Sequence, residues 1–168
     1  MKTESTQTEP RIDDREEEHY LGIRFVTPFR GMFAVVERTK KELKRWVAAH
    51  PVEGSGPYFL RYHVIDMNGP MDVEVGLKTP TKLQGDERVK PGVLPQGRYA
   101  SLIYRGSGLA GHRALVTWIR DTEGISSDVT ELPEGDHFTC RYEATLTDEG
   151  VESRKKLQDI ELSIKLRE

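Results

Sequence analysis

One acidic residue of this chain stands where a carboxylate could do chemistry. Glu143 belongs to a strand-like segment, residues 138–146, in which apolar side chains recur at every second position. Alternation places Glu143 on one face with Thr145, with Phe138 expected near that face, and places a second set on the other: Cys140, Tyr142, Ala144 and Leu146. On a half-exposed strand Glu143 is a solvated carboxylate. Buried, it needs a charged partner or takes up a proton, so it would serve as a receptor for an organic cation or as a general acid.

Aromatic residues form the second candidate group. The chain has two Trp, six Tyr and five Phe, and several fall near the junction of the predicted elements: Trp46, Tyr62, Tyr104, Trp118 and Phe138. Tryptophans at helical spacing are typical of a plain core. If these rings instead surround Glu143, aromatic faces and one anion together make a receptor for flat, lipophilic cations. The sequence leaves both interpretations open.

Other motifs point away from common chemistries. Residues 106–111 spell G-x-G-x-x-G after a predicted strand, but the chain continues into a long loop and an antiparallel pair instead of a parallel crossover. We therefore interpret this motif as a flexible strand-to-helix turn. Of the five scattered histidines only His137 lies close to Cys140, and no serine occupies a G-x-S-x-G turn. We predict no metal site and no cofactor.

The elements that must position these residues occur twice. Four pairs of similar segments follow in the same order: 20–25 with 99–104, 43–47 with 115–119, 59–63 with 139–143, and 72–78 with 159–165. A duplicated unit predicts a pseudo-two-fold molecule with a cleft along its internal axis, and small-molecule pockets tend to form at such interfaces. In that arrangement Glu143 would face the cleft.

Hydrophobic periodicity gives each half the same order of elements, β-α-β-β. The predicted elements are strands at 20–26, 58–66, 71–78, 97–105, 138–146 and 157–166, and helices at 32–47 and 109–122. The predicted fold class is α+β: two pseudo-two-fold-related β-α-β-β modules with antiparallel sheets and a ligand cleft between them.

The domain prediction follows from the same pattern. Residues 1–18 are polar and acidic and are predicted to be a flexible N-terminal segment. Residues 19–168 form one predicted domain, with module one at 19–78, an irregular linker at 79–96 and module two at 97–168.

Composition limits the functional classes. The formal net charge of −3 and a pI near 6.0 provide no electrostatic footprint for nucleic acid. No apolar run approaches the roughly 20 residues of a membrane span, and the N-terminus lacks a secretory signal pattern. One cysteine, Cys140, excludes an internal disulfide and suits a reducing compartment. We predict a cytoplasmic monomer that binds neither nucleic acid nor membrane.

From about residue 9 onward the chain resembles GyrI-like domains, the small-molecule-binding modules also found as effector-binding halves of AraC-type and MerR-type regulators. The resemblance rests on short motifs in a fixed order: Gly56-Pro57-x-Phe59-x-Arg61-Tyr62-His63, Val73-Glu74-Val75-Gly76, Leu94-Pro95-x-Gly97-x-Tyr99-Ala100, Tyr104-x-Gly106, Leu115-x-x-Trp118 and Cys140-Arg141-Tyr142-Glu143-x-x-Leu146-Thr147-Asp148.

This resemblance implies two β-α-β-β modules around a pseudo-two-fold, with a central glutamate facing drugs and cationic dyes in the cleft between them. The matching position here is Glu143. The predicted ligand-binding set is therefore Glu143, Tyr62, Tyr104, Trp118, Trp46, Phe138, Thr145 and His63. The predicted function is a stand-alone multidrug-binding protein that sequesters lipophilic, cationic aromatic compounds.

Two alternatives stay open. Some family members hydrolyse strained cyclopropane rings of DNA-alkylating natural products with that glutamate and an aromatic hydroxyl. Here Glu143 and Tyr104 would be the catalytic pair, although Phe138 and Thr145 stand where such relatives often carry tryptophan and tyrosine. One family member inhibits DNA gyrase, which implies an interaction protein as the second alternative.

Overall fold

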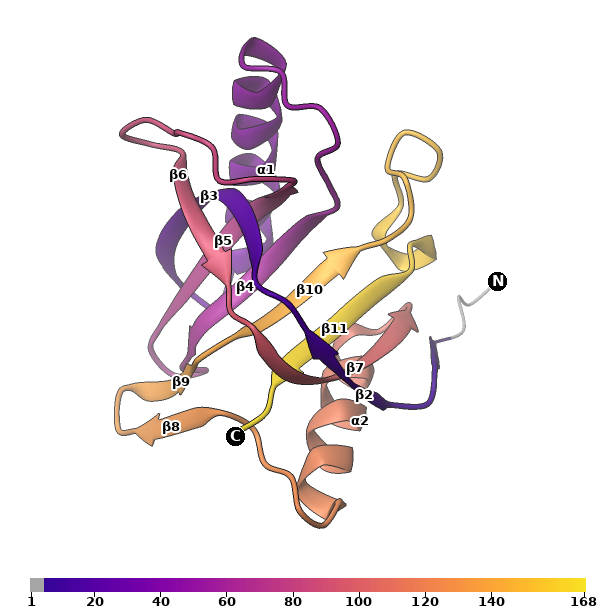
Figure 1. Cartoon of the computed structure of the whole chain (residues 1–168). Helices are drawn as coiled ribbons and strands as arrows, with labels where there is room; N and C mark the ends of the chain where they lie inside the picture. The colour runs from indigo at the N-terminus through magenta and orange to yellow at the C-terminus, as the bar shows by residue number, and fades with distance from the viewer. Residues whose placement is uncertain (1–4) are drawn as a thin grey trace.

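The computed structural model of the chain describes residues 5–168, which form two helices and a large antiparallel sheet (Figure 1). The strands are β1 (Thr6–Gln7), β2 (Arg11–Arg15), β3 (Glu18–Pro28), β4 (Tyr58–Ile65), β5 (Pro70–Thr79), β6 (Lys90–Leu94), β7 (Gly97–Arg105), β8 (Val129–Leu132), β9 (Gly135–Phe138), β10 (Arg141–Thr145) and β11 (Ile160–Lys165). The helices are α1 (Met32–Ala49) and α2 (Gly108–Asp121), and a 3₁₀ turn occupies Lys155–Leu157.

The central strands of the sheet run in the order β7-β11-β10-β4-β5-β3. In the second half of the chain, β7, β11 and β10 follow one another from the edge inward, as the first, last and middle strand of that half. In the first half, β3, β5 and β4 follow in the same way. Strands β10 and β4 join the halves, with Glu143 opposite Leu60 on one side and Leu162 on the other. The α+β class with antiparallel pairing is confirmed, whereas the pseudo-two-fold relation remains a prediction.

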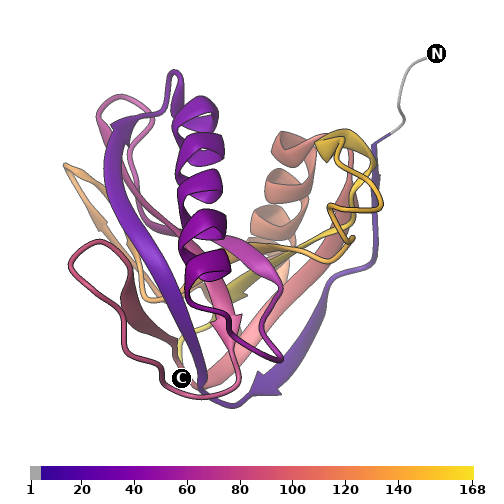
Figure 2. The same cartoon turned by 90° about the horizontal axis from the view of Figure 1, so that it is seen from above.

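Both helices pack on the same face of the sheet (Figure 2). Helix α1 packs with Met32, Val36 and Leu43 on β3, β4 and β5, and α2 packs with Leu115 and Ile119 on β7 and β11. The opposite face carries its own aromatic cluster, which includes Tyr20, Phe59, Tyr99 and Tyr142. The middle strands are thus covered on both faces, which is the condition for burying an inward-facing polar residue.

The N-terminal segment differs from the predicted flexible region. Residues 1–4 lie outside the described part, but β1 and β2 pair with β7 at the edge of the sheet. Arg15 anchors this segment, because its guanidinium donates to the Tyr142 hydroxyl and to Ser163 Oγ, both at 2.9 Å, and lies over the Tyr99 ring. The charged composition concealed a strand that is held by polar contacts and not by apolar burial.

Two loop predictions also need correction. The linker 79–96 contains β6, which pairs with β3. The loop 124–136 contains most of the β8–β9 hairpin, and the predicted strand 138–146 is interrupted between Phe138 and Arg141. In each case glycine, proline and charged residues hid short pairings that the neighbouring strands impose.

The G-x-G-x-x-G motif is a tight turn with a helix cap. Gly106 has a φ of 95°, which is readily available only to glycine. Ser107 caps α2 by accepting a hydrogen bond from the Ala110 backbone N–H at 3.1 Å. A Cβ on Gly111 would approach ring atoms of Tyr104 to 2.7 Å, so this glycine lets α2 pack closely on β7. The motif therefore has a packing role in positioning Tyr104.

Candidate functional site

Glu143 lies at the centre of the sheet on the face that carries the helices. Its neighbours across the strands, Leu60 and Leu162, belong to the buried cores under α1 and α2. The residue is only 6% exposed. The carboxylate is therefore withdrawn from bulk water, and its ionisation is decided by protein groups.

Three side chains donate hydrogen bonds to this carboxylate. The Tyr62 hydroxyl of β4 reaches Oε1 at 3.2 Å, and the Tyr104 hydroxyl of β7 reaches Oε2 at 2.6 Å. His112 of α2 contacts Oε2 through Nε2 at 3.0 Å. Since a carboxylate offers about four acceptor positions, Oε1 is the less saturated oxygen.

Arg141 fixes the role of His112. One guanidinium nitrogen, Nη2, lies 2.7 Å from His112 Nδ1, which must accept this hydrogen bond because arginine only donates. The imidazole then carries its proton on Nε2 and donates it to Glu143. The Arg141 guanidinium lies over the Phe138 ring at 4.9 Å and over the Tyr62 ring at 5.9 Å. Arginine, imidazole and carboxylate form a chain of fixed polarity.

The net effect of these contacts is to keep Glu143 ionised. Burial by itself raises its pKa, but the hydrogen bond and the electrostatic attraction of His112, the positive charge of Lys155 and the hydrogen bond from Tyr104 outweigh burial and lower the pKa from 4.5 to about 2. Burial, and next the negative charge of Glu143, raise the pKa of Tyr62 and of Tyr104. At neutral pH the site holds an anion that accepts hydrogen bonds from three side chains. Such a group can bind a cation or accept a proton, but it cannot act as a general acid.

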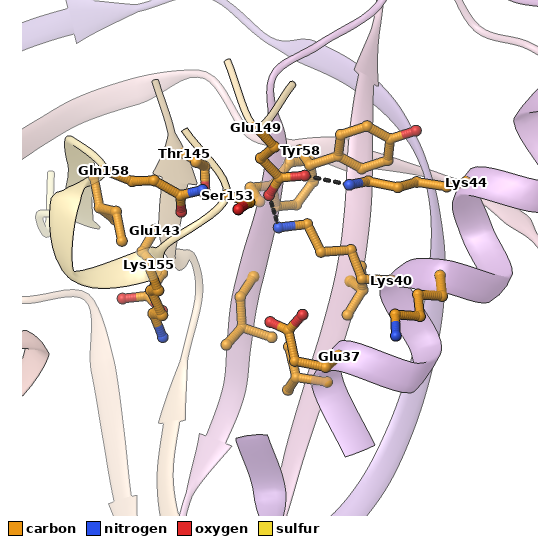
Figure 3. A pocket seen from close by; sticks show the side chains of 16 residues that line it. Glu37, Lys40, Lys44, Tyr58, Glu143, Thr145, Glu149, Ser153, Lys155 and Gln158 are labelled. Atoms are coloured by element: carbon orange, nitrogen blue, oxygen red, sulfur yellow. Dashed lines mark hydrogen bonds and ion pairs between the residues drawn. The ribbon is translucent and has the colours of Figure 1, made fainter. Parts of the chain in front are cut away.

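A pocket of about 260 Å³ opens beside Glu143, between α1, the middle strands and the loop at residues 146–158 (Figure 3). Its apolar lining comes from Val36 of α1, Phe59 and Leu60 of β4, Val75 of β5, and Ile160 of β11. Tyr58, Thr145, Ser153 and Gln158 add polar atoms, and the charged lining residues are Glu37, Lys40, Lys41, Lys44, Glu149, Lys155 and Glu143 itself.

The structure brings together part of the predicted binding set. Tyr62 and Tyr104 both contact Glu143, and Thr145 lines the pocket with it. Phe138 does not line the pocket but lies under Arg141, packed against the α2 core. The tyrosines lie behind the carboxylate as donors rather than in the pocket wall.

The other three predicted residues lie away from the pocket. Trp46 donates from Nε1 to Asp86 at 2.7 Å and stacks on His50, while Trp118 packs in the core under α2. His63 is on the opposite face of the sheet, because it alternates with Tyr62, and its Nε2 lies 2.8 Å from Glu74. The aromatic residues that line the pocket are Tyr58 and Phe59, which were not in the predicted set.

Four residues of this region were not singled out in the sequence. Arg141 carried a usable signal, since it stands two residues before Glu143 and alternation puts both on one face. His112 carried none, because only the placement of α2 brings it over the sheet. Lys155 and Glu149 come from the 146–158 loop, whose course periodicity does not define.

Within residues 5–168 no group of three or more His, Cys, Asp or Glu side chains is arranged to hold a metal ion. Cys140 is buried on the face opposite Glu143. No helix in the described range is long and apolar enough to cross a membrane.

Several solved structures share this fold. The chain of EcmrR in complex with DNA superposes with a TM-score of 0.68 at 14% identity over 95% of this chain, which spans 57% of that EcmrR chain. The EcmrR C-terminal domain alone gives a TM-score of 0.64 at 14% identity, covering 95% of this chain and 98% of the domain.

Two further solved structures with this fold are a protein with a bound organic cation and a hydrolase. SAV2435 bound to tetraphenylphosphonium has a TM-score of 0.65 at 9% identity, with 95% of this chain and 94% of SAV2435 covered. A hydrolase from Listeria innocua has a TM-score of 0.57 at 13% identity, with 94% and 91% covered. At such identities the likeness concerns the fold.

No curated protein sequence matches the chain significantly. A family model, the GyrI-like small molecule binding domain, matches residues 8–121. This match covers more than half of the sequence and includes β2 to α2, the elements that carry Tyr62, Tyr104 and His112. The chain belongs to the GyrI-like small-molecule-binding family.

Proposed function

We propose that this protein binds lipophilic organic cations in the pocket beside Glu143 and so sequesters them. The observation that carries the proposal is a buried, ionised carboxylate beside the apolar part of the pocket lining. An anion in that position attracts a cation strongly, because little water is present to screen the interaction. The apolar lining would remove the ligand's hydrocarbon surface from water at about 25 cal/mol per Å² before ordering terms are subtracted.

The geometry of the carboxylate supports this role. Oε2 accepts from both Tyr104 and His112, while Oε1 accepts from Tyr62 at the longer distance of 3.2 Å. Oε1 therefore keeps the greater acceptor capacity for a cation. The fold of SAV2435, whose structure contains tetraphenylphosphonium, is compatible with such a ligand.

The direct test is a titration with tetraphenylphosphonium by isothermal calorimetry. We expect saturable binding of one cation per chain with micromolar affinity. Trp46→Phe serves as a control that leaves affinity unchanged, since Trp46 contacts Asp86 and His50 outside the pocket. Absence of saturable binding, or a loss of affinity in this control as large as in Glu143→Gln, would overturn the proposal.

A hydrolase remains the second candidate, and one observation favours it. The Tyr104 hydroxyl lies 2.6 Å from Glu143, so an ionised base and a phenol are already paired. In this candidate Glu143 accepts a proton from water as the water oxygen bonds to a ring carbon; one ring C–C bond breaks, and its electron pair stays on the alkylator, which takes up a proton. Incubation with a cyclopropane-containing alkylator decides between the two functions: more than one ring-opened product per protein indicates turnover, and a ceiling of one excludes it. The gyrase interaction, the cytoplasmic location and the monomeric state stay predictions.

A further inference from the structure

The 146–158 loop covers one side of the pocket and is organised largely by its own hydrogen bonds. Asp148 accepts from the backbone N–H groups of Val151 and Glu152, and Gln158 donates to the Glu152 carbonyl oxygen at 2.8 Å. Thr147 Oγ1 accepts from the Asp159 backbone N–H at the base of the loop. These hydrogen bonds tie the loop to itself and to the start of β11.

Ionic side chains join this loop to α1. Glu149 extends from the loop and pairs with both Lys40 and Lys44, which lie one turn apart on the helix (Figure 3). Lys155 additionally lies over the Phe33 ring at 4.4 Å. The two lysines thus converge on a single carboxylate, and they do so at the wall of the pocket that Glu143 also lines.

The pocket lining is unusually rich in positive charge for a cation receptor. It contains four lysines, Lys40, Lys41, Lys44 and Lys155, against three glutamates. Glu149 neutralises part of this charge while it holds the pair. With Glu149 displaced, the α1 side of the pocket presents two ammonium groups, that of Lys40 on a side chain 17% exposed and that of Lys44 on one 41% exposed.

We propose that Lys40 and Lys44 form an anion subsite for the carboxylate or sulfonate of an amphipathic ligand, and that Glu149 is the internal occupant which such a ligand displaces. This inference rests on the proposed function, because it assigns the second pole of the same ligand. One end of the molecule carries the cation that faces Glu143, its apolar body contacts Leu60, Val75 and Ile160, and its anionic end replaces the Glu149 carboxylate.

In the native protein, Glu149 competes with the ligand's anion for Lys40 and Lys44. The ligand's anion gains the two ammonium groups while Glu149 loses them and returns to water, so the net gain in the native chain is small. Removal of the Glu149 charge abolishes this competition. The affinity for an anion-bearing ligand should then increase, and the increase should depend on the lysines.

Two dyes with the same ring system test the subsite. Rhodamine 123 is a lipophilic cation whose carboxyl group is a methyl ester, and rhodamine 110 carries the same ring with a free carboxylate. For Glu149→Gln we expect rhodamine 110 to bind about tenfold tighter than to the native chain, the scale of a charge-assisted hydrogen bond gained. Rhodamine 123 should not gain.

Matched variants assign that change to the subsite. Glu152→Gln removes the same charge from the same loop, but Glu152 pairs with Arg154 and not with α1, so it should leave the ratio of the two affinities unchanged. Adding Lys40→Gln and Lys44→Gln to Glu149→Gln should remove the gain for rhodamine 110. Fluorescence anisotropy gives the affinities, and thermal unfolding verifies that each variant is folded.

The outcomes separate the two proposals. If both dyes bind but Glu149→Gln changes them equally, or if the gain survives removal of the lysines, the anion subsite is wrong while the cation site stands. If the native chain binds neither dye but Glu149→Gln binds rhodamine 110 through the lysines, the subsite stands and the cation proposal is wrong. If no variant binds either dye, both are overturned.

Discussion

Replacing Glu143 by glutamine removes one negative charge from the pocket floor and keeps nearly the same shape. The amide oxygen can accept the hydrogen bonds from Tyr104 and His112 that now reach Oε2. The amide nitrogen then faces the Tyr62 hydroxyl, which can rotate and accept. The variant therefore changes the charge of the site with little change in its packing. It also leaves the nearby Arg141 without its anionic counterpart.

The expected change in ligand affinity follows from Coulomb's law. A cation about 5 Å from the carboxylate at an effective dielectric constant of about 20 interacts by about 3 kcal/mol. Arg141 and Lys155 persist in the variant, and the cation still pays for its desolvation. We expect a net loss of about 1–3 kcal/mol, or roughly 5- to 150-fold in the dissociation constant.

Tetraphenylphosphonium and tetraphenylborate have almost the same shape and opposite charge, which makes them a matched pair for calorimetric titration. Glu143→Gln should weaken binding of the cation by the factor above and should strengthen binding of the anion. A neutral ligand of similar shape should change much less. Equal loss for both ions, or no change for either, would refute the charge role of Glu143 even if the pocket binds ligands.

Three further predictions concern the support of the site. Tyr104→Phe removes a 2.6 Å hydrogen bond to a buried anion and should lower the free energy of unfolding in urea by about 1.5–3 kcal/mol, more than Tyr62→Phe, whose bond is 3.2 Å; an equal loss would contradict this. Gly111→Ala brings a Cβ to 2.7 Å from the Tyr104 ring and should cost about 1–3 kcal/mol, measured as a lower melting temperature than that of Gly108→Ala, although alanine favours helix. The pKa of Glu143 is depressed to about 2 in the folded state, so its stabilisation is complete above about pH 4.5 and is lost as the pH falls toward 2. The stability of the native chain minus that of Glu143→Gln should fall by about 3 kcal/mol across this window, and a difference that does not vary with pH would show that Glu143 is not held ionised.

Much of the fold was predictable because local patterns and global packing agree. Alternation in 97–105 and the apolar spacing of 32–47 identified β7 and α1 with nearly correct bounds. The order of elements in both halves followed in the same way. The short pairings were missed because β2 and β6 form on strands that already exist, and their charged or glycine- and proline-rich sequences carry no strand signal of their own.

The candidate site likewise has a part that strand periodicity predicts and a part that it does not. Because side-chain direction in a strand has a period of two, the sequence put Glu143 and Thr145 on one face, but it left open whether that face is buried. It named Tyr62 and Tyr104 as candidates, and only the sheet order places β4 beside β10 and β7 beyond β11. It also placed His63 in the wrong group, since the same period turns His63 away from Tyr62.

Only the tertiary structure decided which groups control the carboxylate and the pocket. His112 contacts Glu143 because α2 packs on β7 through Gly111. Glu149 pairs with Lys40 of α1 because the 146–158 loop covers one side of the pocket. These contacts join segments separated by tens of residues, and their geometry depends on how helices and loops pack on the sheet. Periodicity specifies the face of an element but not the neighbour that face will meet.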